Sequence, residues 1–136
     1  MAALSGITAV RPTANTTMKL GVYGSTNSAG QSAYLDAADT KYKLADSNAS
    51  AATAASVGVY ITPGVLDGYG YIATGGSVIL VGTTMVVGTV YCPGTTAGSI
   101  VPISDLTTGD YSTILGTAST ATQLDLAIKA SGVVKP

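Results

Sequence analysis

The chain lacks the residue types that most often carry catalysis near neutral pH. Its 136 residues include no histidine, which is the usual general base and metal ligand in that range. All seven acidic residues are aspartates, so glutamate is missing as well. Ser-His-Asp triads, Cys-His pairs and histidine-ligated zinc sites therefore cannot be built from this chain alone. We expect no enzyme here, and no metal or other cofactor.

A few remaining residues could still do chemistry. Asp36 and Asp39 are close enough to suggest acid–base work or calcium binding. A calcium loop needs a denser cluster of oxygens, so we interpret this pair as a solvated turn. Asp105 and Asp110 flank a Thr-Thr-Gly loop and are interpreted as turn formers too. Cys92 is the single cysteine; without a histidine to activate it, we expect a buried apolar residue.

Glycine-rich and tyrosine-rich stretches offer binding rather than catalysis. Gly68–Gly70 and Gly75–Gly76 lack the spacing of a phosphate-binding fingerprint, and turns explain them. Tyr60, Tyr69 and Tyr71 could stack on sugars or bases if they share one face of a strand. In a chain without Phe or Trp, however, tyrosines more often fill the core or a subunit contact.

The low charge and the broken apolar runs argue against two classes of binding partner, nucleic acid and membrane. The net charge is −1 and the six basic residues are spread thinly, so the phosphate neutralisation that nucleic-acid binding needs is missing. The longest apolar run, Val78–Cys92, is broken by Gly and Thr and is shorter than the roughly 20 residues that cross a bilayer. Met1–Gly6 has no signal-peptide pattern. We expect no nucleic acid and no membrane, and a protein that packs against other subunits.

Short strands separated by turns dominate the rest of the chain. Met18, Leu20 and Val22 alternate with Lys19, Gly21 and Tyr23, which indicates a half-buried strand. Further strands are predicted at 32–35, 41–45, 57–62, 77–81, 85–92, 99–104, 111–117 and 122–130. This spacing favours an all-β fold, a compact β-sandwich or barrel of about eight short strands.

One short helix and an extended N-terminal arm complete the predicted organisation. The alanine-rich segment 46–56 is the helix, capped by Asp46, Ser47 or Asn48. Residues 1–17 are predicted to form the arm and residues 18–136 a single β domain. Such an arm is either a frayed terminus or ordered on a partner, and its apolar residues favour the partner. The candidate interface residues are Leu4, Ile7, Val10, Arg11, Tyr69 and Tyr71.

Several stretches of the chain carry a resemblance to a known family. These stretches are Tyr34–Asp46, the alanine-rich run from Ala49, Val57–Val59, Asp105–Gly116 and Leu124–Pro136. In the types of residues that they contain and in their order along the chain, they resemble the small capsid cement, or head decoration, proteins of tailed bacteriophages and prophages. The resemblance covers most of residues 30–136, with 61–72 the least typical part.

The resemblance implies a passive structural role. Proteins of this kind are made in the host cytoplasm and sit on the outer surface of the capsid. They bridge neighbouring major capsid subunits, often as homo-oligomers, here a dimer or trimer, and hold the shell against the pressure of packed DNA. Two alternatives stay open: a carbohydrate-binding β module on the virion exterior that uses Tyr60, Tyr69 and Tyr71, and, far behind, an enzyme that uses Asp and Lys or Ser and Lys.

Overall fold

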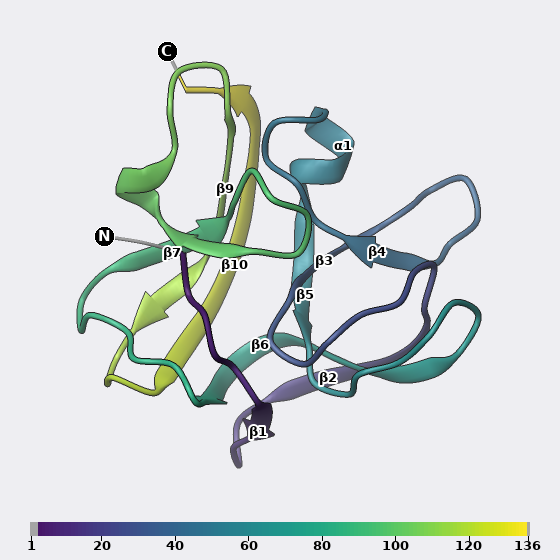
Figure 1. Ribbon diagram of the computed structural model, residues 1–136, viewed down its shortest axis with the longest axis horizontal. Coiled ribbons are helices and arrows are strands. Elements are labelled where there is room, and N and C mark those ends of the chain that lie inside the picture. The colour runs from purple at the N-terminus through teal and green to yellow at the C-terminus, as the bar shows by residue number, and fades with distance from the viewer. Residues whose placement is uncertain (1–2, 136) are drawn as a thin grey trace.

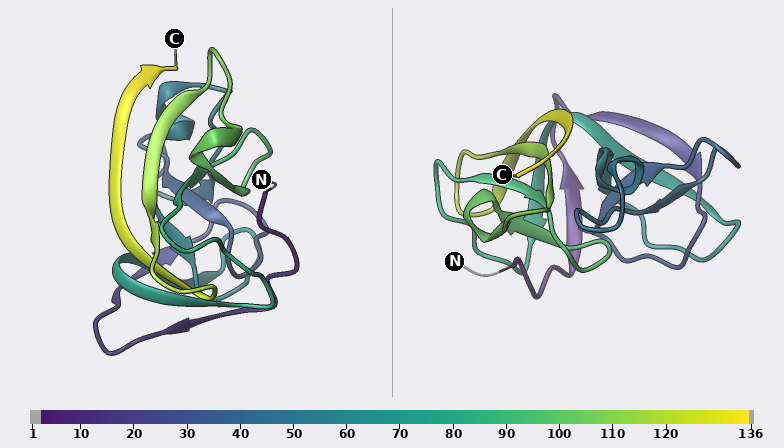
Figure 2. Two further views of the ribbon diagram at one scale, coloured as in Figure 1. Left: turned by 90° about the vertical axis from the view of Figure 1, so that its left-hand side faces the viewer. Right: turned by 90° about the horizontal axis from the view of Figure 1, so that it is seen from above.

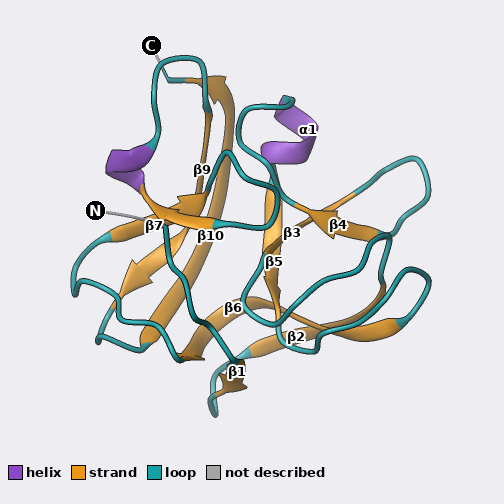
Figure 3. Ribbon diagram, viewed as in Figure 1, coloured by secondary structure: helices purple, strands orange, loops and turns teal. Residues whose placement is uncertain are grey.

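The computed structural model describes residues 3–135, and strands connected by turns make up most of this part of the chain (Figure 1, Figure 3). The strands are β1 (Ala9–Pro12), β2 (Thr17–Val22), β3 (Ser32–Leu35), β4 (Tyr42–Leu44), β5 (Ser56–Tyr60), β6 (Tyr69–Val81), β7 (Val90–Pro93), β8 (Ile100–Pro102), β9 (Tyr111–Ala118) and β10 (Gln123–Val134). One short helix, α1 (Ala51–Ala54), and a single 3-10 turn (Ile103–Asp105) interrupt them. The all-β prediction is confirmed.

The ten strands form one antiparallel sheet that curves into a half-barrel. Neighbours along it follow the order β4-β3-β5-β6-β10-β9-β7-β8, while β1 and β2 add to β6. The structure therefore has more strands than the predicted eight or so. Of the two predicted architectures, the single curved sheet is closer to the barrel than to the two-sheet sandwich. Pro102 lies in β8, the last strand in this order.

The long strand β6 joins the two halves of the sheet. Its first half pairs with β2 and β5, and its second half pairs with β1 and β10. The change of partners falls at Gly75 and Gly76. Gly76 has a φ of +71°, and a Cβ there would overlap the backbone carbonyl of Asn15. The sequence suggested a break between strands at these glycines, whereas the structure bends one continuous strand.

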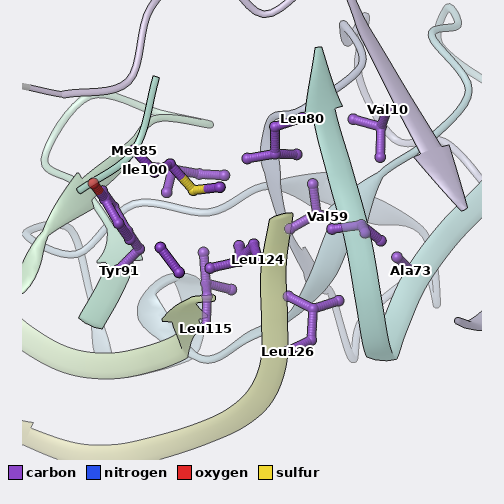
Figure 4. Close-up of a cluster of buried hydrophobic side chains, with 12 residues drawn as sticks. Val10, Val59, Ala73, Leu80, Met85, Tyr91, Ile100, Leu115, Leu124 and Leu126 are labelled. Atoms are coloured by element: carbon purple, nitrogen blue, oxygen red, sulfur yellow. The ribbon is translucent and has the colours of Figure 1, made fainter. Parts of the chain in front are cut away.

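The main core lies under the second half of the sheet (Figure 4). Apolar side chains from β1 and from β5 to β10 meet there, together with Met85 from the loop after β6. The members are Val10, Val59, Ala73, Val78, Leu80, Met85, Tyr91, Ile100, Leu115, Ala118, Leu124 and Leu126. Leu124 and Leu126 of β10, within the strand predicted at 122–130, point inward while Asp125 between them is exposed.

A smaller, tyrosine-rich core fills the curve formed by β2 to β6. It contains Tyr23, Ala33, Tyr42, Tyr60 and Ile72. The rings of Tyr23 and Tyr60 meet edge to face, with centroids 5.1 Å apart. Just after β2, Tyr23 forms a β-bridge with Tyr42 at the start of β4. This contact draws the two ends of the curved half together.

The predicted extended N-terminal arm is not evident in the described residues. Residues 9–12 are β1, which pairs with β6, and the amide of Leu4 donates a hydrogen bond to the carbonyl of Ile100 at 2.9 Å. Figure 2 shows this segment lying along the domain. The apolar residues that suggested a partner are satisfied by the chain itself, because β6 offers a pairing edge beside the main core.

Two element boundaries also differ from the prediction. The helix is much shorter than 46–56, and its cap is Ser50 rather than Asp46, Ser47 or Asn48. Ser50 Oγ accepts from the amide of Thr53 at 3.2 Å, and Thr53 Oγ1 accepts from the amide of Ser50 at 3.0 Å. This reciprocal pair fixes the start of the helix. The last strand, predicted to end at 130, continues to Val134 along β9.

Candidate interaction surface

The groups that could carry chemistry are engaged structurally. In residues 3–135 there is no group of three or more His, Cys, Asp or Glu that could hold a metal ion. Cys92 is fully buried, and burial raises the pKa of its thiol to about 11. This thiol is therefore protonated near neutral pH. No helix within the described residues is long and apolar enough to span a membrane.

Asp36 and Asp39 form a turn, as predicted. Asp36 Oδ1 accepts from the amide of Ala38 at 2.9 Å, and Asp39 Oδ1 accepts from the amide of Lys41 at 3.1 Å. Lys43 Nζ lies 2.6 Å from Asp36 and 3.1 Å from Asp39. The hydrogen bond from Lys43 is the largest cause that lowers the pKa of Asp36. The carboxylates are thus neutralised locally.

Asp110 is also a turn former. Its Oδ2 accepts hydrogen bonds from the amide of Thr107 at 2.8 Å and from the hydroxyl of Thr107 at 3.2 Å. The side chain is buried at the base of the loop. Its function there is to close the turn, which agrees with the sequence interpretation.

The structure separates the three tyrosines that the sequence grouped. Tyr60 is completely buried in the smaller core, and desolvation raises the pKa of its hydroxyl. Tyr69 and Tyr71 lie on the opposite face of the sheet, with 72% and 47% of their surface exposed. A sugar or protein in solution can therefore contact Tyr69 and Tyr71 but not Tyr60.

An exposed apolar face surrounds the two accessible tyrosines. In the β2–β6 ladder Tyr71 lies opposite Leu20, and Ala73 lies opposite Met18. Leu20 is 59% exposed and Met18 is 47% exposed. We call the four side chains of Met18, Leu20, Tyr69 and Tyr71 the β2–β6 face. Because directly opposed and alternate residues share one side of a sheet, they are neighbours on one surface.

Glycines on the core side explain why the large side chains point outward. Gly21 pairs directly with Gly70. A Cβ at Gly21 would overlap the ring of Tyr42, and one at Gly70 would overlap the hydroxyl of Tyr23. The strand predicted at 18–23 is present as β2. The side that carries Met18 and Leu20, however, faces solvent instead of the core. Sequence reasoning therefore missed Met18 and Leu20 as surface residues, and the Gly-Tyr-Gly-Tyr alternation was the available signal.

The N-terminal candidates do not join this face. Leu4 and Ile7 are partly buried against the main core, and Val10 is 6% exposed within it. Arg11 is exposed, but it pairs opposite Ile79 in the other half of β6 from the tyrosines. Of the six predicted interface residues, the structure brings together only Tyr69 and Tyr71.

Comparisons of the chain with family models, with curated proteins and with solved structures found no match. Fold and surface together define a small all-β protein with an uncharged, tyrosine-bearing face. Its functional interpretation depends on that face and on the composition of the chain.

Proposed function

We propose that the protein is a capsid cement, or decoration, protein of a tailed bacteriophage or prophage. It binds the outer surface of the assembled head, bridges neighbouring major capsid subunits and stabilises the shell against the pressure of packed DNA. It acts by binding, without turnover or cofactor. The sequence resemblance suggests the family, and the β2–β6 face provides a surface suited to the task.

The single observation that carries the proposal is the exposed pair of Leu20 and Tyr71 beside Tyr69. The largest contiguous apolar patch on a soluble protein, on the order of a few hundred Å², is often an interaction site. Tyrosine is enriched at the energetic centres of interfaces because its ring is large and rigid and its hydroxyl tolerates water. We therefore assign the capsid contact to the β2–β6 face rather than to an arm.

Many weak contacts suffice for a clamp of this kind. Subunits on a shell are held at high local density, so that modest pairwise affinities add through multivalency. Arg11, exposed on β1, remains available as a second contact. Leu4, Ile7 and Val10 act mainly by holding β1 to the domain.

Occupancy of heads that lack the protein tests the proposal. Added wild-type protein should bind them and raise the temperature at which they release DNA. The double variant Tyr69→Ala with Tyr71→Ala should lower the affinity about tenfold or more, as expected when interface tyrosines are truncated. The control is Val86→Ala with Val87→Ala, an exposed aliphatic pair outside the β2–β6 face. Heads equally robust with and without the protein would contradict the proposal.

A second candidate function is carbohydrate binding on the virion exterior. It is favoured by the placement of Tyr69 and Tyr71 two residues apart on one exposed side of β6, since sugars stack on aromatic rings. The buried Tyr60 takes no part in it. Screening the wild-type protein on a glycan array checks this function, and an array without binding that Tyr69→Ala abolishes would remove it.

A further inference from the structure

Two neighbouring aliphatic side chains project from the loop between β5 and β6. Val65 and Leu66 are both more than half exposed. The amide of Gly68 donates a hydrogen bond to the carbonyl of Val65 at 2.9 Å, which closes a β-turn with Leu66 at its apex. Polar residues, glycine and proline usually occupy such turns, so an aliphatic pair here is suited to a contact. We call Val65 and Leu66 the β5–β6 knob.

The backbone beside the knob is firmly held. Asn27 and Gly64 exchange two backbone hydrogen bonds, at 3.0 and 3.3 Å. The amide of Asp67 donates to the carbonyl of Tyr23 at 2.8 Å. Asp67 has a φ of +65°, which is uncommon for a residue other than glycine, and its carboxylate lies 2.6 Å from Lys41 Nζ. A preformed loop of this kind loses little conformational entropy when it binds.

A groove of about 610 Å³ lies between the turn that follows β3 and helix α1. Its apolar lining comes from Leu35, Ala52, Ala55 and Val57. Leu35 and Ala52 are exposed, so the groove is accessible from solution. In Figure 1 the turn at 36–41 and the β5–β6 loop lie together at the right-hand end of the molecule. The knob and the groove therefore share one end of the domain.

The polar groups that line the groove favour an apolar guest. Asp36 Oδ2 accepts from Lys43 Nζ at 2.6 Å, and Thr53 Oγ1 donates to the carbonyl of Asp46 at 3.1 Å. Tyr34 is also part of the lining, and its ring adds apolar surface. A charged segment would lose its hydration here without gaining a free partner among Asp36 and Thr53.

We propose that the β5–β6 knob of one copy docks in the groove of a second copy. A compact aliphatic pair on a rigid turn fits an open apolar groove, and each chain supplies both halves of the contact, so two copies can exchange them reciprocally. The net charge of −1 offers little repulsion between copies. None of these residues belongs to the β2–β6 face, so the inference goes beyond the proposed capsid contact and uses a different surface.

The available area predicts a weak contact in dilute solution. The knob exposes on the order of 200 Å², so two reciprocal contacts bury on the order of 800 Å² in total, about half of the ~1,600 Å² in a standard interface. The association is therefore concentration-dependent and is favoured where copies are crowded on one surface.

A second turn on the chain provides a matched control. Val86 and Val87 are exposed, and the amide of Thr89 donates to the carbonyl of Val86 at 3.1 Å. Gly88 takes the position with positive φ that Asp67 takes in the other turn. The two turns carry similar apolar pairs, so general stickiness of apolar turns would involve both, whereas docking in the groove selects the knob.

Sedimentation velocity of the full chain tests the docking. The wild type should shift from monomer to dimer as its concentration rises toward about 1 mM, the range of a weak contact. Leu66→Asp should remove the shift, because a carboxylate would enter an apolar groove beside Asp36, while Val87→Asp should leave it intact. Ala52→Glu, which fills the groove, should also remove the shift. Ala51→Glu, on the same exposed helix but outside the lining, should not.

Mixed cross-linking tests which surfaces meet. On mild oxidation, Leu66→Cys mixed with Ala52→Cys should form a disulfide between the two variants in preference to Leu66→Cys mixed with Ala51→Cys. A wild type that stays monomeric, or equal effects of Leu66→Asp and Val87→Asp, would overturn the docking. An unchanged dimer of Ala52→Glu would overturn the assignment to the groove.

Head binding separates this inference from the proposed function. Tyr69→Ala with Tyr71→Ala should weaken binding to heads and leave the dimer of free protein intact. Leu66→Asp should remove that dimer and leave binding of single copies to heads intact. A monomeric wild type that binds heads would remove the docking alone, and a dimer of the expected contact that does not bind heads would remove the cement function alone.

Discussion

Gly21 lies directly opposite Gly70 in the β2–β6 ladder, and on the core side of this pair the ring of Tyr42 and the hydroxyl of Tyr23 occupy the space of two Cβ atoms. The same backbone that admits these rings presents Leu20 and Tyr71 to solvent. The tyrosine core and the exposed apolar face are thus two consequences of one glycine pair.

Gly70→Ala should destabilise the domain, because the new methyl group would overlap the hydroxyl of the buried Tyr23. Overpacking of this kind costs about 1–3 kcal/mol in the free energy of unfolding. The matched control is Gly75→Ala, whose Cβ would only make ordinary contact with Thr17 at 3.6 Å. Urea unfolding measures both variants, and equal stabilities would show that the glycine pair does not matter.

Tyr60→Phe should stabilise the protein at alkaline pH. Burial raises the pKa of Tyr60 in the folded state above its ordinary value near 10. The unfolded chain therefore ionises first, and stability that is fully present below about pH 10 is lost as the pH rises toward the folded pKa. The Tyr60 hydroxyl makes no hydrogen bond of good geometry with the described residues. Its removal should therefore reduce the alkaline loss of stability and change the free energy of unfolding at neutral pH very little.

Tyr23→Phe provides the comparison for Tyr60→Phe. The hydroxyl of Tyr23 donates to the carbonyl of Thr62 at 2.6 Å, so its loss should lower the free energy of unfolding by about 1 kcal/mol at pH 7. Chemical denaturation between pH 7 and 11 distinguishes the two variants. If both behaved alike at neutral pH, the difference in hydrogen bonding would be refuted.

Asp36→Asn should weaken the acid dependence of stability. The hydrogen bond from Lys43, followed by the one from the Ala38 amide, lowers the folded-state pKa of Asp36. Its contribution is present above the unfolded value near 3.9 and is lost as the pH falls through the folded pKa. Because both side chains are partly exposed to solvent, the effect should be small and should fade with added salt. Denaturant midpoints between pH 6 and 2.5 measure it, with Asp105→Asn as the control.

Local features of the fold were predictable from residue patterns. Alternation along β10 placed Leu124 and Leu126 on one side of the strand, because a pattern with period two belongs to a single strand. The turn at Asp36 was predictable because short acidic side chains bond to their own backbone.

Features that join distant segments could not be predicted in this way. Alternation shows that Leu20 and Tyr23 lie on opposite sides of a strand, but not which side meets the core. That choice depends on Gly70 across the ladder. The bend at Gly76 likewise depends on Asn15, some 60 residues earlier in the chain, whose side-chain oxygen accepts from the amide of Ser77 at 3.1 Å. Such contacts have no signature within one segment.

Val10→Ala tests whether the N-terminal segment belongs to the domain. Val10 is 6% exposed in the main core, where β1 pairs with β6. Its truncation should lower the free energy of unfolding by about 1–3 kcal/mol, since a buried side chain is lost and a cavity remains. The adjacent Arg11→Ala, at an exposed position, should change it by no more than about 0.5 kcal/mol. Thermal unfolding of both proteins measures the contrast. A Val10→Ala protein as stable as the wild type would mean that the N-terminal segment is detached from the domain in solution. The segment would then be a free arm, as the sequence predicted.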